Sequence, residues 1–216
     1  MKKRDRLIPK EMRLPVIYSL LCNVIAYNGT RLLTADQFHY DLSGRLDEWI
    51  PFVPWTVTIY LGCYAFWFVN YVIGCRQERE RAFCFMGADL LAKVICMLCF
   101  LLFPTTNTRP VIEGTSVWEE LMRFVYRVDA ADNLFPSIHC LMGWFCFIAF
   151  RNNEKIPGWY RGASLLMAVC ICISTLTTKQ HVLPDVIAGI ALAEGSHLLV
   201  KKSGAAGWYA SRITGL

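Results

Sequence analysis

The sequence predicts an all-α, polytopic membrane protein, a bundle of six transmembrane helices in one domain that spans residues 1–216. Hydrophobic residues make up 55% of the 216 positions and charged residues only 18%. The mean hydropathy is +0.37, which is too apolar for an ordinary soluble domain. Apolar residues gather in runs, several of which approach the roughly 20 residues that a helix needs to cross a bilayer.

Six apolar runs follow one another along the chain, at about residues 14–27, 50–73, 82–103, 137–150, 158–176 and 183–200. The second run is the clearest, because it is long enough to cross the bilayer and contains aromatic residues suited to membrane interfaces. The first and fourth runs are short, and we expect the first to extend toward Leu33 with tilt. The polar segment 34–49 can hold a short interfacial helix.

The third run contains Asp89 and Lys93, four positions apart. On a helix these side chains face each other, and pairing lowers the cost of removing both charges from water. A structural ion pair is the simpler interpretation, and a role in a functional site is the alternative. Ten cysteines lie in or beside the apolar runs without the spacing of a zinc site. We expect them to act as small buried hydrophobic side chains.

A polar segment of about 30 residues, 104–134, separates the third and fourth runs. Its length indicates a function, such as a lid. Within it, Ser116–Val128 has the pattern of an amphipathic helix, which we expect to lie over the site.

The distribution of positive charge predicts the orientation in the membrane. An even number of spans places both termini on one side, and that side carries fifteen Lys and Arg residues against six on the other. The positive-inside rule then places both termini in the cytoplasm. The segments that join runs three and four, and runs five and six, fall together on the outer side. Length and the lack of a targeting signal favour a bacterial plasma membrane. Because no basic stripe alternates with aromatic residues, we expect no binding to nucleic acid.

Two of the apolar runs begin with polar, titratable residues. One run starts at Phe135-Pro136-Ser137-Ile138-His139 and the other at His181-Val182-Leu183-Pro184-Asp185. Such residues are costly in a membrane and indicate a functional site. Ser137 is suited to the N-cap of one helix and Pro184 to the first turn of the other. Two helix N-termini that point at one place would suit an anion such as phosphate.

The residue types predict phosphoryl transfer through a phosphohistidine. His181 is the expected nucleophile, Asp185 orients it, and His139 is the general acid and then the general base. Arg109 can bind phosphate through two hydrogen bonds, and Lys179 adds a point charge. Ser137 and the N–H groups of its helix complete the anion site. This chemistry requires no metal and no cofactor.

The same residues resemble the type-2 phosphatidic acid phosphatase superfamily of six-helix membrane enzymes, which is related to the vanadium haloperoxidases. The second motif of that family, Pro-Ser-Gly-His, corresponds to Pro136–His139. Its third motif, Ser-Arg, five residues, His, three residues and Asp, corresponds to residues 174–185. Of its first motif, only Arg109-Pro110 matches. The resemblance covers residues 104–189, and it implies a catalytic core at about residues 104–190.

The sequence departs from the family pattern at two cationic positions. Leu102 stands where the first motif has lysine, and Thr175 stands where the third motif has arginine. Lys179 is a candidate replacement for one of these charges. The bulky Ile138 between Ser137 and His139, and the pair Gln180-His181, are more similar to the branch of inositol phosphorylceramide synthase and sphingomyelin synthase.

The resemblance implies a membrane enzyme that hydrolyses a lipid phosphate or diphosphate monoester. A phosphotransferase that moves a phospho-headgroup between lipids is one alternative. A catalytically inactive membrane binding protein is another, because two family cations are missing. Phosphatidate, phosphatidylglycerol phosphate and isoprenyl diphosphate all remain open as substrates, and the sequence gives no indication of oligomeric state.

Overall fold

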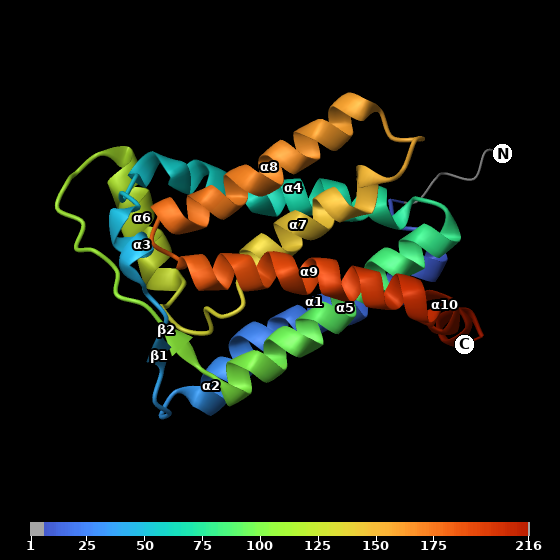
Figure 1. The fold of residues 1–216 in the computed structure, drawn as a ribbon, viewed down its shortest axis with the longest axis horizontal. Helices are drawn as coiled ribbons and strands as arrows, with labels where there is room; N and C mark the ends of the chain where they lie inside the picture. Colours follow the sequence, from blue (N-terminus) through green and yellow to red (C-terminus); the bar gives the residue numbers. More distant parts are fainter. Residues whose placement is uncertain (1–6, 216) are drawn as a thin grey trace.

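The computed structural model describes residues 7–215, and within that range the fold is almost entirely helical (Figure 1). The predicted all-α class is therefore confirmed. Only two short strands occur among the described residues, β1 (Tyr40–Asp41) and β2 (Thr105–Thr106), which pair in parallel. The basic residues Lys2, Lys3, Arg4 and Arg6, which contribute to the predicted orientation, lie outside the described residues.

The first apolar run forms a helix that changes its winding partway along. The short η1 (Lys10–Met12) leads into α1 (Arg13–Val24), the π-helical turn η2 (Ile25–Gly29) and α2 (Thr30–Thr34). The chain is thus helical through Leu33, as expected. Its exposed side is strongly apolar, with Leu20, Leu21, Val24, Ile25, Leu32 and Leu33 all exposed.

Among residues 7–215, four helices are long and apolar enough to cross a membrane. They are η3 (Pro54–Thr56) continued by α4 (Val57–Cys75), then α5 (Arg79–Leu102), α8 (Gly158–Thr177) and α9 (Leu183–Ser203). The helix α7 (Ile138–Arg151) is apolar but shorter. All six predicted runs are therefore helical, while the count of six membrane spans stays a prediction.

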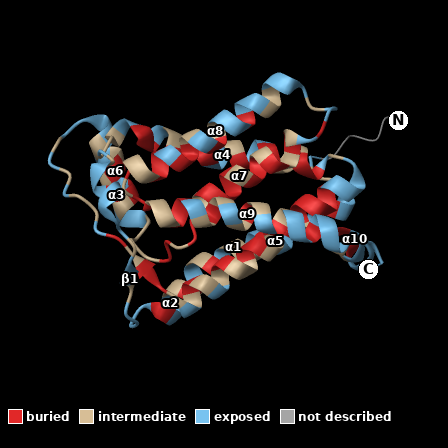
Figure 2. Cartoon of the chain, viewed as in Figure 1, coloured by how far each residue is buried: buried red, intermediate tan, exposed pale blue. Residues whose placement is uncertain are grey.

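The helix α7 lies at the centre of the bundle, because every one of its residues is buried or half-buried (Figure 2). It packs against α4, α5, α8 and α9. Its side chains Leu141 and Phe145 join Met86 and Cys96 of α5 and Ile171 of α8 in one buried hydrophobic cluster. All ten cysteines are free, and seven are buried, which agrees with the expected role as small hydrophobic side chains.

The bundle has two distinct ends. At one end lie η1 and the last helix, α10 (Ala205–Thr214), whose residues Met12 and Ile213 belong to the same buried cluster. Gly204 separates α9 from α10 in the left-handed conformation, with φ of 70°, which glycine adopts without steric cost. At the other end lie α3 (Arg45–Trp49), α6 (Val117–Val128) and the strand pair (Figure 1).

The two connections that were expected on one side do lie together at this second end. Asn107 Nδ2 donates to the carbonyl of Lys179 over 3.0 Å, and the Tyr126 hydroxyl donates to the carbonyl of Thr178 over 2.7 Å. The predicted helices in these polar segments are confirmed as α3 and α6. Ser116 caps α6, because its Oγ accepts from Glu119 N and Glu119 Oε2 accepts from Ser116 N.

The bundle encloses a buried polar cluster formed by α1, α4 and α5. Lys93 Nζ lies 3.0 Å from Asp89 Oδ2 and 2.7 Å from Ser19 Oγ. Ser19 Oγ donates to Asp89 Oδ2 over 2.5 Å, and the Tyr71 hydroxyl donates to Asp89 Oδ1 over 2.5 Å. The structural ion pair predicted from the spacing of Asp89 and Lys93 is therefore confirmed. We call these four residues the bundle cluster.

Candidate active site

The N-termini of α7 and α9 meet at the second end of the bundle. Ser137 N donates to the carbonyl of Asp185 over 3.0 Å, so the two helix starts are joined through their main chains. Ser137 Oγ accepts from Cys140 N over 3.3 Å, which confirms Ser137 as the N-cap of α7. Gly189 permits this contact, because a Cβ atom there would lie 2.6 Å from the carbonyl oxygen of Ser137.

His181 and Asp185 form a buried pair at the start of α9. His181 Nδ1 lies 3.2 Å from Asp185 Oδ2, and the same oxygen accepts from Val182 N over 3.1 Å. This geometry holds the ring so that Nε2 is the nitrogen left for chemistry. Burial disfavours the charged ring, but the hydrogen bond and charge of Asp185 outweigh that effect, so the pKa of His181 is raised.

His139 lies one residue inside α7 and faces His181 across a gap. The centroids of the two imidazole rings are 5.8 Å apart, with the rings inclined by 58°. The ring of Tyr60 stacks on His139 at 4.5 Å, and Trp67 lies at 5.5 Å. Within the described residues, His139 Nε2 is buried without a hydrogen-bond partner. The structure therefore brings the two sequence-predicted histidines together and leaves a nitrogen available.

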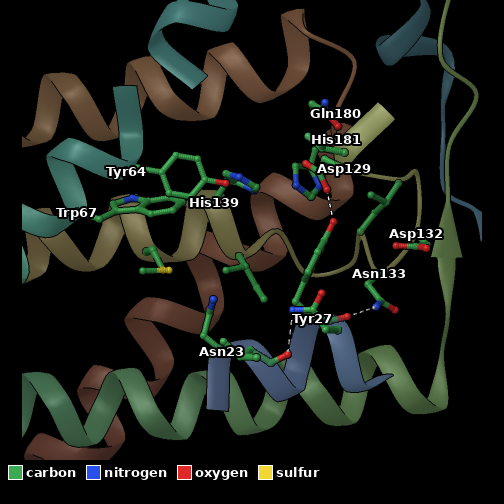
Figure 3. Close-up of a pocket in the computed structure, with 16 residues that line it drawn as sticks. Asn23, Tyr27, Tyr64, Trp67, Asp129, Asp132, Asn133, His139, Gln180 and His181 are labelled. Atoms are coloured by element: carbon green, nitrogen blue, oxygen red, sulfur yellow. Dashed lines mark hydrogen bonds between the residues drawn. The ribbon is translucent and has the colours of Figure 1, made fainter. Parts of the chain in front are cut away.

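Both imidazole rings line one cavity of about 250 Å³, which we call the histidine cavity (Figure 3). Its walls come from η2 and the end of α1, from α4, from the segment 128–134, from α7 and from the turn before α9. Apolar side chains such as Val24, Leu134, Ile138 and Met142 share these walls with polar groups. The cavity can therefore accept a molecule with both an apolar and a polar part.

Asp129 is a carboxylate in this cavity that sequence reasoning missed. It lies just after α6, and its carboxylate accepts hydrogen bonds from the hydroxyl groups of Tyr27 and Tyr60, the latter over 2.7 Å. Burial works against its ionised form, yet the pKa of Asp129 is lowered by the nearby charge of His139 and by the two tyrosine hydroxyl groups. Nothing in the local sequence marks this residue, because its partners lie far away along the chain.

Arg109 lies beside the site, but its side chain is held by the protein. Its Nη1 donates to the carbonyl of Asp129 over 2.5 Å, and its Nη2 donates to Gln180 Oε1. The guanidinium also lies over the ring of Tyr126, 4.7 Å from the centroid. Arg109 thus joins the segment after α6 to the turn before His181. Its predicted contact with phosphate stays a prediction.

Lys179 is adjacent to the site in sequence, yet its ammonium group points toward α3. Its Nζ donates to the carbonyls of Asp47 and Ile50, over 2.8 and 2.6 Å. Lys179 and Arg109 line a second cavity of about 390 Å³, together with Asp47 and Glu48 of α3. His181 lines this α3 cavity too, so the nucleophile candidate stands between the two cavities.

The histidine cavity contains acidic and aromatic groups instead of the predicted cations. Asp129 and Asp132 line it, as do the rings of Tyr27, Tyr64 and Trp67. Among its lining residues, all within the described range, none is Lys or Arg. Asp132 is paired with Arg31 over 2.8 Å. Between residues 7 and 215, no group of three or more His, Cys, Asp and Glu residues is arranged to hold a metal ion.

Residues 31–199 match the family model described as the PAP2 superfamily. This match covers most of the chain. It includes all the predicted site residues, which are Arg109, Ser137, His139, Lys179, His181 and Asp185. No curated protein and no solved structure matches the chain.

Proposed function

The chain belongs to the PAP2 superfamily, and from this premise we propose that it is a membrane phosphatase that hydrolyses a lipid phosphate or diphosphate monoester through a phosphohistidine on His181. One observation carries the proposal: the His181–Asp185 pair faces His139 across a single cavity, with the two rings 5.8 Å apart. A nucleophile with an orienting carboxylate, opposite a second imidazole, is the arrangement that covalent acid–base catalysis needs.

The proposed reaction has two steps. His181 Nε2 attacks phosphorus, the bond from phosphorus to the lipid oxygen breaks, and His139 gives that oxygen a proton. A water molecule then attacks the phosphohistidine while His139 takes up its proton, and the N–P bond breaks to release phosphate. Asp185 holds the Nδ1 proton of His181 in both steps and stabilises the ring when it carries positive charge. The enzyme returns to its starting protonation state.

The lipid tail would leave the histidine cavity between apolar helices. Val24 and Met142 line the cavity, and the side of α1 and α2 that carries Leu20, Leu32 and Leu33 is exposed. Four long apolar helices support an integral membrane location. We propose a bacterial plasma membrane, cytoplasmic termini and a site that faces outward. Cysteine-accessibility labelling from each side of sealed vesicles tests this orientation.

The direct test is release of phosphate by purified protein from a panel of lipid phosphates and diphosphates. We expect release from at least one lipid by the wild-type protein, and none above background by His181→Ala. The variant must still be recovered from the membrane fraction and elute as a single folded species. Full activity in His181→Ala would reject the mechanism.

A lipid phosphotransferase is the second candidate, and one observation favours it. The residues that line the histidine cavity include two Asp but no Lys or Arg, within the part of the chain described. A phosphodiester carries one negative charge less than a phosphate monoester and would be repelled less by these carboxylates. When an acceptor alcohol is supplied with a phosphodiester lipid, a new phosphodiester indicates transfer, whereas free phosphate from a monoester indicates hydrolysis.

The third candidate is an inactive binding protein. It is favoured by the hydrogen bonds of Arg109 and Lys179, which both go to oxygen atoms of the protein itself. Vanadate separates it from both enzymes, because bound vanadate forms a five-coordinate species that resembles a phosphoryl transition state. An active site should be inhibited at low vanadate concentration. An inactive protein should show no saturable, His181-dependent binding of vanadate.

A further inference from the structure

We infer that Asp129 is the carboxylate partner of His139, a positioning residue that stabilises the protonated ring while it donates to the leaving lipid oxygen. This inference rests on the proposed function in assigning the acid role to His139. The arrangement itself, a half-buried carboxylate that lines the same cavity as that ring, is independent of which phosphate ester is the substrate.

Asp129 is fixed from several directions at once. The Tyr27 hydroxyl from η2 and the Tyr60 hydroxyl from α4 both donate to its carboxylate. Arg109 Nη1 donates to its main-chain carbonyl over 2.5 Å. Side chains from η2, from α4 and from the polar segment after α5 therefore converge on one residue. These bonds hold the carboxylate in one position at the wall of the histidine cavity.

Tyr60 connects Asp129 to His139. Its hydroxyl donates to Asp129 Oδ2 over 2.7 Å, while its ring stacks on the imidazole of His139 at 4.5 Å and 27°. Asp129 and His139 also line the same cavity (Figure 3). The ionised form of Asp129 is favoured by the charge of His139. Because such coupling is reciprocal, the carboxylate favours a protonated His139 to the same extent.

Four titratable groups from three parts of the chain face His139. From α4, Tyr60 and Tyr64 present their rings. From the turn before α9 comes His181, and from the segment after α6 comes Asp129. Of these groups, only Asp129 bears a negative charge near neutral pH. The Asp185 carboxylate is already bonded to His181 and to Val182 N.

The chemistry explains why a second carboxylate is useful. At the start of the reaction His139 must carry a proton on the nitrogen that faces the substrate, while His181 Nε2 must carry none. Burial among aromatic rings disfavours a charged His139, and a protonated His181 nearby would disfavour it further. Asp185 is bonded to His181, so the negative charge that favours a proton on His139 comes from a second carboxylate, Asp129.

The test is the pH profile of Asp129→Asn in the full-length purified protein. The expected kcat is about tenfold to a hundredfold lower at neutral pH, with KM within about twofold of the wild-type value. The rate requires protonated His139, so it declines on the basic side of its optimum. Without the carboxylate the proton is lost sooner, and this basic limb should move down by about one pH unit.

Two further variants separate charge from structure. Asp129→Glu keeps the charge and should restore the position of the basic limb. If the role of Asp129 is purely structural, the basic limb of Asp129→Glu should lie no closer to the wild-type position than that of Asp129→Asn. Asp132→Asn removes another carboxylate from the same cavity, one that is paired with Arg31. It should move the basic limb less than Asp129→Asn does. An equal movement would show that any cavity carboxylate suffices and would overturn the assignment.

A second measurement does not depend on catalysis. In protein with the inactivating substitution His181→Ala and isotope-labelled histidine, the ring signals of His139 can be titrated by NMR, with and without Asp129→Asn. We expect a lower titration midpoint when the carboxylate is removed. If the midpoint does not move, the inference is wrong even if the phosphatase proposal holds. If it moves but the wild-type protein hydrolyses nothing, the pairing stands and the proposed function fails.

Discussion

The two buried polar clusters of this protein differ in what they leave unpaired. In the bundle cluster, both carboxylate oxygens of Asp89 accept hydrogen bonds, from Tyr71, Ser19 and Lys93. In the candidate active site, within the residues described, His139 Nε2 and Asp185 Oδ1 are buried with no partner. A cavity of about 250 Å³ lies against both histidines.

Unpaired polar atoms distinguish a functional polar cluster from a structural one inside an apolar bundle. A buried polar group costs free energy unless it is paired, so a cluster that only holds helices together pairs its groups internally. Groups left unpaired next to a cavity are available to a ligand. By this criterion the bundle cluster is structural, and the cluster at the N-termini of α7 and α9 is the site.

The largest expected effect is on catalysis. Asp185→Asn should lower kcat by about a thousandfold or more, because the amide no longer fixes the tautomer of His181 or stabilises its charge. Thermal stability should change little. In the wild-type protein Val182 N donates to Asp185 Oδ2, and the amide oxygen of the variant can still accept this hydrogen bond. The measurement is the rate of phosphate release beside a melting curve. A small loss of rate with a large loss of thermal stability would show that the His181–Asp185 pair is structural and not catalytic.

The reverse pattern is expected for the bundle cluster. Lys93→Met leaves the buried Asp89 carboxylate without its cation and should cost about 3–5 kcal/mol of folding stability. The rate per folded molecule should be close to that of the wild-type protein, because the cluster does not line the histidine cavity. The double variant Asp89→Leu with Lys93→Met should regain much of the stability. Chemical denaturation in detergent micelles can measure both values.

Gly189→Ala tests whether the close contact between α7 and α9 supports the site. The added Cβ would lie 2.6 Å from the carbonyl oxygen of Ser137, so the two helix starts must move apart. We expect a loss of about 1–3 kcal/mol in stability together with a lower rate. Gly195→Ala, on the same helix with nothing within 4 Å of its Cβ, is the matched control and should affect neither.

The smallest expected effect is a movement of the acidic limb of the pH profile. His181 attacks through an unprotonated Nε2, and its pKa is raised mainly because Asp185 outweighs burial. The rate should therefore decline as the pH falls through a midpoint above about 6.5, the ordinary histidine value. Asp185→Asn should shift that midpoint downward. An upward shift, measured on the residual activity, would contradict this account of the pair.

Much of the fold could be predicted because its signals are local. Apolar runs mark the helices, Ser116 and Ser137 mark two of the helix starts, and the spacing of four places Asp89 against Lys93 and Asp185 against His181. Such contacts depend on one turn of helix, which is set by the residues themselves. The number of membrane spans does not follow from these local signals, because α7 is short and α1 continues through a π-helical turn.

The orientation of the long cationic side chains could not be predicted. Arg109 and Lys179 are the expected phosphate ligands, yet both donate to oxygen atoms of the protein. A long flexible side chain reaches whichever acceptors the fold brings near it. Those acceptors lie on segments distant in the sequence, so the residue type gives the charge but not its direction.

Neighbours within a few residues set the helices, the Ser137 cap of α7, the place of Pro184 in the first turn of α9, and the pairing of Asp185 with His181, so all of these could be read from the sequence. Only the tertiary structure decided that His139 faces His181 and that Asp129 joins them. The bond from Tyr27 to Asp129 spans 102 positions. The fold brings η2 to the segment after α6 to make that contact, and no local pattern encodes it.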